Sequence, residues 1–336
     1  MFRNVWILIA ANNRRNSQKS LLLASLFLIA ALGIALPNGI STFSSDNQAQ
    51  AQQQTGQIKI NKLWETPSDL KNPESVVYAP KQNVLFVSNV DGKPDQKDQK
   101  GFISKVSPSN GSIIQLNWIT GLNAPKGIAI YNNSKLYVSD ITDLVEIDIA
   151  SGKIIKRFTA PGSVFLNDVA SDGHGNIYVS DTITNTIYKL DTNAKDSMAL
   201  QIWLKSPELN GPNGLHVDNN KNRLIVASLG DMSKPGAGIK VVDLKNKAIR
   251  SLGKEGTTSP FGGLDGIESN ANETHYYVTD NPAGKVYTVN ADGTGYGILL
   301  DLHTQGTADL GYIPNQSTII IPLMQDNKLV AYKLIE

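Results

Sequence analysis

The sixteen residues LNDVASDGHGNIYVSD, Leu166 to Asp181, contain the pattern that decides the fold. An apolar residue and a polar residue open one short strand, a Gly-rich turn follows, and a second β-branched strand ends in Ser-Asp. Variants recur along the chain, with the polar residue at Glu74, Lys126, Asn167, Asn213, Asp265 and Asp309. The differences between these numbers are 52, 41, 46, 52 and 44. This period is typical of the four-stranded blades of a β-propeller.

The strand runs agree with six blades. About a dozen residues after each polar position comes a β-branched or aromatic run, namely 84–88, 136–140, 177–181, 224–228, 276–280 and 319–322. No stretch after position 56 sustains the 3.6-residue apolar period of a long helix. The sequence therefore predicts an all-β chain, a six-bladed β-propeller with four-stranded blades around a central channel. We expect residues 57–63 to pair with residues 328–334 and close the ring, which removes exposed strand edges.

Residues 1–56 have a different composition from the rest. Arg14, Arg15 and Lys19 precede an uncharged apolar run over 21–36, which is short for a membrane span and typical of an export signal. A small-x-small site at Ala49 to Ala51 allows cleavage after Ala51, although retention as an N-terminal membrane anchor is the alternative. The predicted domains are thus residues 1–56, a signal or anchor with a disordered lead, and residues 57–336, one exported propeller, periplasmic or extracellular.

Composition excludes several classes of function. The chain has no Cys, so it has no disulfide, thiol nucleophile or thiolate metal site. Lys and Arg number 31 against 30 Asp and Glu, and no basic cluster indicates a nucleic-acid partner. Gly-x-Ser-x-Gly and phosphate-binding loops are absent from the sequence.

The six polar positions open the innermost strands, so we expect them to surround the channel at one end. Three are carboxylates, two are amides and one is Lys126. Such oxygen-rich sets suit a hard divalent cation, Ca²⁺ first. The alternative is that Asn, Asp and Gly stand there because tight turns favour them. Four oxygen-bearing side chains at equivalent places, Glu74, Asn167, Asn213 and Asp265, favour the metal site.

The ordered set of phrases Pro73-Glu74, 167–176, 211–215 and 264–267 resembles the signature segments of the gluconolactonase and senescence marker protein family. That family consists of six-bladed propellers that hold one divalent metal and hydrolyse sugar lactones. The resemblance implies that Glu74, Asn213 and Asp265 are metal ligands and that Asn167 is a fourth ligand or a substrate contact. It also implies metal-assisted hydrolysis of a lactone or related ester, with Asp265 handling the proton. Asp168 is the candidate for an orienting acceptor beside it.

Three departures from the family pattern bear on substrate and site. Phe165 stands where gluconolactonases usually place an Arg, which argues against a sugar lactone and for a more apolar lactone or an aryl ester. Lys126 brings a cation to the ring, where it could bind an anionic substrate, pair with Glu74 or Asp309, displace part of the metal's role, or extend to the channel mouth. Asp309 adds a further channel-lining carboxylate, with pairing to Lys126 as one explanation.

The competing hypothesis is a non-catalytic exported propeller that binds a ligand or protein and holds a structural metal. His216 follows Asn213 by three residues, and strand alternation predicts that it points away from the ring and is satisfied between blades. We expect Asp140, Asp181 and Asp280 to anchor blade turns.

Overall fold

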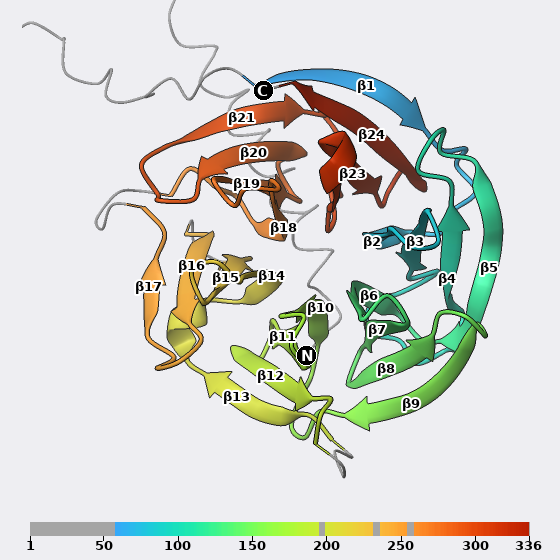
Figure 1. Ribbon diagram of the computed structural model, residues 1–336, viewed down its shortest axis with the longest axis horizontal. Helices are drawn as coiled ribbons and strands as arrows, with labels where there is room; N and C mark the ends of the chain where they lie inside the picture. Colours follow the sequence, from blue (N-terminus) through green and yellow to red (C-terminus); the bar gives the residue numbers. More distant parts are fainter. Residues whose placement is uncertain (1–57, 195–198, 231–235, 254–258, 336) are drawn as a thin grey trace, which may run out of the picture. The chain divides into compact units, whose positions relative to one another are not determined.

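The computed structural model describes residues 58–194, 199–230, 236–253 and 259–335. Six four-stranded antiparallel sheets form a ring, with one innermost strand of each sheet near the centre and one outermost strand at the rim (Figure 1). This confirms the predicted six-bladed β-propeller. The described residues contain no α-helix, only two 3₁₀ turns, Pro207–Leu209 and Pro314–Gln316.

The blades follow one another along the chain, each written here from the innermost strand outward. Blade one contains β2 (Pro73–Ala79), β3 (Val84–Asn89), β4 (Gly101–Val106) and β5 (Ile113–Leu122). Blade two contains β6 (Pro125–Tyr131), β7 (Lys135–Asp140), β8 (Asp143–Asp148) and β9 (Lys153–Thr159). Blade three contains β10 (Leu166–Ser171), β11 (Asn176–Asp181), β12 (Thr186–Asp191) and β13 (Gln201–Lys205).

The second half of the ring has the same construction. Blade four contains β14 (Pro212–Asp218), β15 (Arg223–Ser228), β16 (Gly238–Asp243) and β17 (Ile249–Ser251). Blade five contains β18 (Leu264–Ser269), β19 (His275–Asp280), β20 (Lys285–Asn290) and β21 (Tyr296–Asp301). Blade six contains β22 (Gly311–Ile313), β23 (Thr318–Leu323), β24 (Lys328–Ile335) and β1 (Lys59–Glu65).

Ring closure joins the two ends of the described chain. Strand β1 pairs antiparallel with β24, from Lys59 opposite Ile335 to Glu65 opposite Val330. The first strand therefore completes blade six as its outermost member (Figure 1). This register confirms the predicted pairing of the first and last strands, which leaves no unpaired edge between them.

Most of the core lies between neighbouring blades. One buried cluster combines Phe86 and Ile103 of blade one with Leu136, Val138 and Val145 of blade two. Equivalent clusters recur around the ring, because each strand of a blade buries alternate side chains against the next blade. Burial on this scale holds the innermost strands, and hence the channel, in fixed positions.

The Asp residues that end the second strands fix the turns, as predicted. The Asp181 carboxylate accepts hydrogen bonds from the backbone N–H groups of Val164, Phe165, Ile183 and Thr184. Asp140 accepts from the N–H groups of Asn123 and Ala124, and Asp280 from those of Gly262 and Gly263. These bonds satisfy turn backbone groups that would otherwise be buried without partners.

The predicted export segment, residues 1–56 with its site at Ala51, lies outside the described residues. Among the residues that are described, no helix is long and apolar enough to cross a membrane.

Candidate functional site

A β-bulge at the start of the innermost strand exposes the polar residues to the channel. In blade three, Leu166 pairs with Asp181 and Val169 with Val179, so Asn167 and Asp168 together oppose the single residue Ser180. The same one-residue shift occurs in blades one, two, four and five. Bulges turn side chains out of the regular alternation and are frequent beside functional sites. We call the residues at the first bulge position the ring: Glu74, Lys126, Asn167, Asn213 and Asp265 in these five blades.

Hydroxyl groups of the second strands replace the hydrogen bonds that the bulges interrupt. Ser180 Oγ accepts from Asp168 N at 2.9 Å and donates to Asn213 O at 2.7 Å, which links blades three and four. Ser88 accepts from Ser75 N, and Thr279 accepts from Gly266 N. The Ser or Thr before the final Asp or Asn of the repeat therefore has a structural role, because it satisfies backbone groups exposed by the bulge.

In blade six, one part of the predicted repeat is displaced by one residue. Thr307 pairs with Leu323 as Leu264 pairs with Asp280, so Ala308 and not Asp309 occupies the first bulge position. Asp309 is at the second bulge position, equivalent to Asp168. Consistent with this, a Cβ on Gly127 would collide with Asp168 Oδ1, and a Cβ on Gly266 would collide with Asp309 Oδ1. The alignment of Asp309 with Glu74 and Asp265 was wrong, because Ala308-Asp309 fits the sequence pattern in either register.

Two ring oxygens are buried without a hydrogen-bond partner among the described residues: Glu74 Oε2 and Asn213 Oδ1. The side-chain amide of Asn213 faces the other way and donates from Nδ2 to Asp265 Oδ1 at 3.0 Å and to Leu264 O at 3.3 Å. Leaving a buried oxygen unpaired costs free energy. The arrangement therefore leaves acceptor oxygens of blades one and four available to a ligand that itself carries positive charge or donors.

Two residues that the sequence analysis missed form hydrogen bonds with ring side chains. Asn281 Nδ2 donates to Asp265 Oδ2 at 2.7 Å, and Thr182 Oγ1 accepts from Asn167 Nδ2 at 3.2 Å. Both residues follow the final Asp of a second strand, at equivalent places in blades five and three. The equivalent residues of blades one, two and six are apolar, Val90, Ile141 and Met324, and they form one small cluster. This contrast is visible in the aligned repeats and could have identified the pair.

Lys126 is buried in the ring with 2% exposure, so it does not extend to the channel mouth. Its Nζ donates to Pro94 O at 2.9 Å and Ala124 O at 3.1 Å and lies 4.3 Å from the Phe165 ring centroid, a cation–π contact. No ion pair to Glu74 or Asp309 forms among the described side chains. Pro94 belongs to the charged loop 91–100 between β3 and β4, so this loop of blade one covers the ammonium group of blade two.

The two second-position carboxylates, Asp168 and Asp309, contact neighbouring blades. Asp168 Oδ2 accepts from Leu215 N of blade four at 2.6 Å, and Oδ1 accepts from Val169 N at 2.6 Å. Asp309 Oδ2 accepts from Ser75 Oγ of blade one at 2.6 Å, and Asp309 N donates to Glu74 O. Asp168 does not hydrogen-bond Asp265, so its contacts connect blades three and four and do not orient that carboxylate.

Burial disfavours the charged form of every carboxylate in this region. It raises the pKa of Asp265 to about 6 and of Asp168 to about 8, in each case against hydrogen bonds that lower the pKa. The pKa values of Glu74 and Asp309 rise well above the usual range through burial and through neighbouring carboxylates, Asp265 and Asp168 respectively. Burial lowers the pKa of Lys126 to about 8, although Glu74 opposes the shift.

This donor set fits a hard divalent cation by its chemistry. Four carboxylates and one ammonium group are buried at this end of the channel, so full ionisation would leave an excess of negative charge that burial penalises. The described residues include no group of three or more His, Cys, Asp or Glu side chains placed to hold a metal. The ring offers two carboxylates and two amides instead, which are the neutral and charged oxygen ligands that Ca²⁺ accepts.

An apolar lip adjoins the ring in blade three. The backbone N–H groups of Val164, Phe165 and Ile183 converge on the Asp181 carboxylate, so these residues lie close together. Val164 is 40% exposed and Ile183 is 43% exposed. Phe165 stands where the resemblance to gluconolactonases led us to expect an Arg, and the Lys126 ammonium group lies over its ring. Of the lip residues, Phe165 contacts the ammonium group, and the exposed side chains of Val164 and Ile183 belong to residues whose backbones lie close to it.

His216 departs in part from its prediction. It does not lie between blades: the bulge at Asn213 and Gly214 interrupts the regular alternation, so His216 lines a channel cavity beyond the ring, where its Nδ1 lies 3.1 Å from Glu268 Oε2 of blade five. Its Nε2, however, is buried without a partner among the described residues. The histidine is therefore only half satisfied.

Known structures with a similar fold include two enzymes. A gluconolactonase from Xanthomonas campestris, described as important in glucose secondary metabolic pathways, matches with a TM-score of 0.61 and 15% identity over 83% of this chain and 91% of its own. This chain shares its fold with a gluconolactonase. A streptogramin B lyase matches with a TM-score of 0.56 and 13% identity over 83% of this chain and 98% of its own. No protein-family model and no curated protein sequence matches. At these identities the likeness establishes the fold alone.

Proposed function

We propose that this propeller is a metal-dependent hydrolase that opens a lactone or a related ester at the ring. The observation that carries the proposal is the pair of unpartnered buried oxygens, Glu74 Oε2 and Asn213 Oδ1, beside the oriented Asp265 carboxylate. Glu74, Asn213, Asp265 and Asn167 would hold one divalent cation, Ca²⁺ first. A bound cation supplies polarisation of the ester carbonyl and lowers the pKa of a water ligand.

The protein groups then have distinct tasks. Amides of Asn213 and Asn281 donate to opposite oxygens of Asp265 and fix the plane of its carboxylate. In the metal-free protein burial raises the pKa of Asp265 to about 6, so its carboxylate is largely deprotonated at neutral pH and can act as a ligand or as a proton acceptor. Lys126 brings positive charge near the ring, where a negative charge develops on the carbonyl oxygen during attack. Asp168 connects blades and is therefore proposed as a positioning residue.

The lip suggests the kind of substrate. Val164, Phe165 and Ile183 favour an apolar acyl or aryl group, whereas a sugar lactone would present hydroxyls to a surface with few polar groups. We therefore propose that apolar lactones or aryl esters exceed glucono-lactone as substrates. A clear preference for glucono-lactone would contradict this part of the proposal.

Calcium calorimetry on the full chain tests the proposal first, with wild type compared with Glu74→Gln. Glu146→Gln, which removes a carboxylate paired with Lys135 in blade two, is the matched control. We expect binding in wild type and control and its loss in Glu74→Gln. Turnover of a lactone and aryl-ester panel, with and without EDTA, follows on the same samples. When the reaction is run in ¹⁸O-labelled water, the label should appear in the product acid. Hydrolysis adds an oxygen atom from water to the acid, whereas elimination does not.

A second function is favoured by one observation, the replacement of the expected Arg by Phe165. On this alternative the exported propeller is a recognition domain and the cation is structural. Calcium binding that is lost in Glu74→Gln, without turnover of any ester, would select the alternative. Absence of calcium binding would contradict both.

A further inference from the structure

Two adjoining cavities lie toward the opposite end of the channel from the ring. Their lining includes Val77, His216 and Glu268, each three residues further along its strand than Glu74, Asn213 and Asp265. Three residues of β-strand span about 10 Å. The cavities have volumes of about 400 Å³ and 280 Å³ and share Glu268, Tyr312 and Pro314. We call this combined hollow the far cavity.

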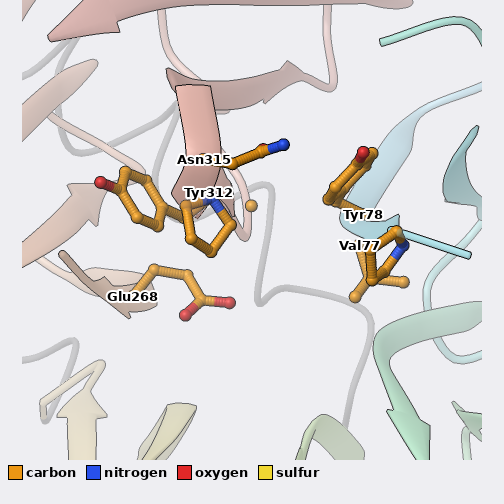
Figure 2. Close-up of a pocket in the computed structure, with 8 residues that line it drawn as sticks. Val77, Tyr78, Glu268, Tyr312 and Asn315 are labelled. Atoms are coloured by element: carbon orange, nitrogen blue, oxygen red, sulfur yellow. The ribbon is translucent and has the colours of Figure 1, made fainter. Parts of the chain in front are cut away.

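The larger part of the far cavity has an apolar wall and one carboxylate. Val77, Tyr78 and Pro80 of blade one line it with Tyr312 and Pro314 of blade six. Figure 2 shows Glu268 on one side of the hollow and Val77 and Tyr78 on the other, with the carboxylate directed toward the space between them. An apolar pocket with a single directed charge is the usual construction of a small-molecule site.

The charge of this cavity has one sign. Glu268 and Glu273 line it, and none of its lining residues in the described chain is Lys or Arg. Glu268 Oε2 is paired with His216, whereas Oε1 accepts no hydrogen bond from the described residues. The side chain of Glu268 is 35% exposed. Its charge also contributes to the raised pKa values of Asp168 and Asp309, so the channel adds to the negative potential here.

We propose that the far cavity binds a small organic ammonium ion whose apolar body lies against the Tyr and Pro wall and whose charged nitrogen meets Glu268 Oε1. An ammonium ion satisfies the unused carboxylate oxygen, and the tyrosine faces attract cations. A neutral ligand would leave Glu268 Oε1 without a charged partner, and an anion would be repelled by two carboxylates. The site is independent of the ring and requires neither a metal nor turnover there.

Three ligands with a shared phenyl group test the proposal on the full chain: 2-phenylethylammonium, 2-phenylethanol and 3-phenylpropanoate. Binding is measured by calorimetry and by ligand-observed NMR. We expect the ammonium ion to bind at least about tenfold more tightly than the alcohol, and the propanoate to bind most weakly, since a single partly buried charge pair contributes roughly one factor of ten. Equal binding of ammonium and alcohol would overturn the proposal, as would preferred binding of the propanoate or no binding by any of the three.

Variants locate the site. Glu268→Gln keeps an acceptor for His216 and removes the charge, so we expect affinity for 2-phenylethylammonium to fall about five- to tenfold while affinity for the alcohol stays unchanged. Glu208→Gln, which removes one carboxylate from the exposed 3₁₀ turn Pro207–Leu209, is the control and should bind as wild type. Unaltered ammonium binding in Glu268→Gln, or an equal loss in Glu208→Gln, would overturn the assignment.

Discussion

The two ends of the channel use the same innermost strands for different chemistry. At the ring, bulges turn Glu74, Asn213 and Asp265 into a buried, oxygen-rich site, in which Asn213 donates to Asp265. Three residues along, regular pairing resumes, and the strands present Val77, His216 and Glu268 to a more open cavity. The difference shows that local pairing, and not only residue type, decides how far a channel side chain is buried. A carboxylate at the ring suits a metal ion, and one at the far cavity suits an organic cation.

The largest expected effect is on turnover at the ring. Asp265→Asn preserves shape and removes the proposed proton acceptor and one anionic ligand, so we expect ester turnover to fall by about 10³-fold. Circular dichroism and thermal unfolding should show an intact propeller. Asp292→Asn, an exposed turn residue of blade five, is the control. Undiminished turnover would remove Asp265 from the mechanism, and altered 2-phenylethylammonium binding would show that the two ends are coupled.

Calcium should stabilise the protein more at pH 7.5 than at pH 5. The pKa of Asp265 is raised from 3.8 to about 6 on folding, so between these values the folded protein holds the proton more tightly than the unfolded chain. The metal-free protein therefore loses stability as the pH rises through this window, by up to about 3 kcal/mol from this group. Glu74, Asp168 and Asp309 have pKa shifts of the same sign.

Bound calcium requires the deprotonated carboxylates, so its stabilising effect grows over the same pH range. Thermal unfolding in calcium and in EDTA at both pH values measures this. We expect the difference in Tm between calcium and EDTA to be larger at pH 7.5. A difference that is equal at the two pH values, or absent, would contradict a calcium site that includes Asp265. A Glu208→Gln variant, changed in the exposed 3₁₀ turn Pro207–Leu209, should show the same pH dependence as wild type.

The next effect concerns the support of the ring. Asn281→Ala removes the donor to Asp265 Oδ2, and loss of such an orienting partner typically weakens metal binding 10- to 100-fold. Asn290→Ala, at the end of β20 in the same blade, removes an amide hydrogen-bonded to Thr294 and serves as the control. Calorimetry with calcium measures both. Wild-type affinity in Asn281→Ala would mean that Asp265 needs no orientation for binding.

The sequence predicted the fold well because the repeat is local in character. Strand runs, the Ser-Asp endings and the pairing of the first and last strands follow from residues that are adjacent or aligned by period. The predicted alignment of blade six was wrong by one residue, because Ala308-Asp309 satisfies the sequence pattern in two registers. The pairing of Thr307 with Leu323 in the structure distinguishes the two registers. The bulges themselves leave no mark in the sequence beyond the Gly, Asp or Ser at their second position.

Other parts of the site depend on contacts between distant segments. The burial of Lys126 requires the carbonyl of Pro94 and the ring of Phe165, from two other blades, and no spacing in the sequence connects these three residues. The role of Asn281 could have been predicted from the sequence, because Asn281 occupies the same place in blade five as Thr182 in blade three. The pairing of His216 with Glu268 was not predicted, because regular alternation turns His216 away from the channel, whereas the bulge after Pro212 brings it into the channel lining beside Glu268.

The smallest expected effect sharpens the distinction between the ends by charge. Lys126→Met keeps the length and the apolar stem and removes the one ammonium group at the ring. We expect calcium affinity to rise severalfold, because a cation near the ring opposes a second cation, and interactions of this kind within a protein contribute on the order of 1 kcal/mol. Lys105→Met, which removes a lysine stacked on Trp118 in blade one, is the control and should leave calcium affinity unchanged.

Lower calcium affinity in Lys126→Met would mean that Lys126 builds the site by holding loop 91–100 through Pro94 more than it opposes the metal. Binding of 2-phenylethylammonium at the far cavity should change much less than calcium binding, since Glu268 lies about three residues of strand away from the ring. Equal changes at both ends would show that the channel acts as one electrostatic unit.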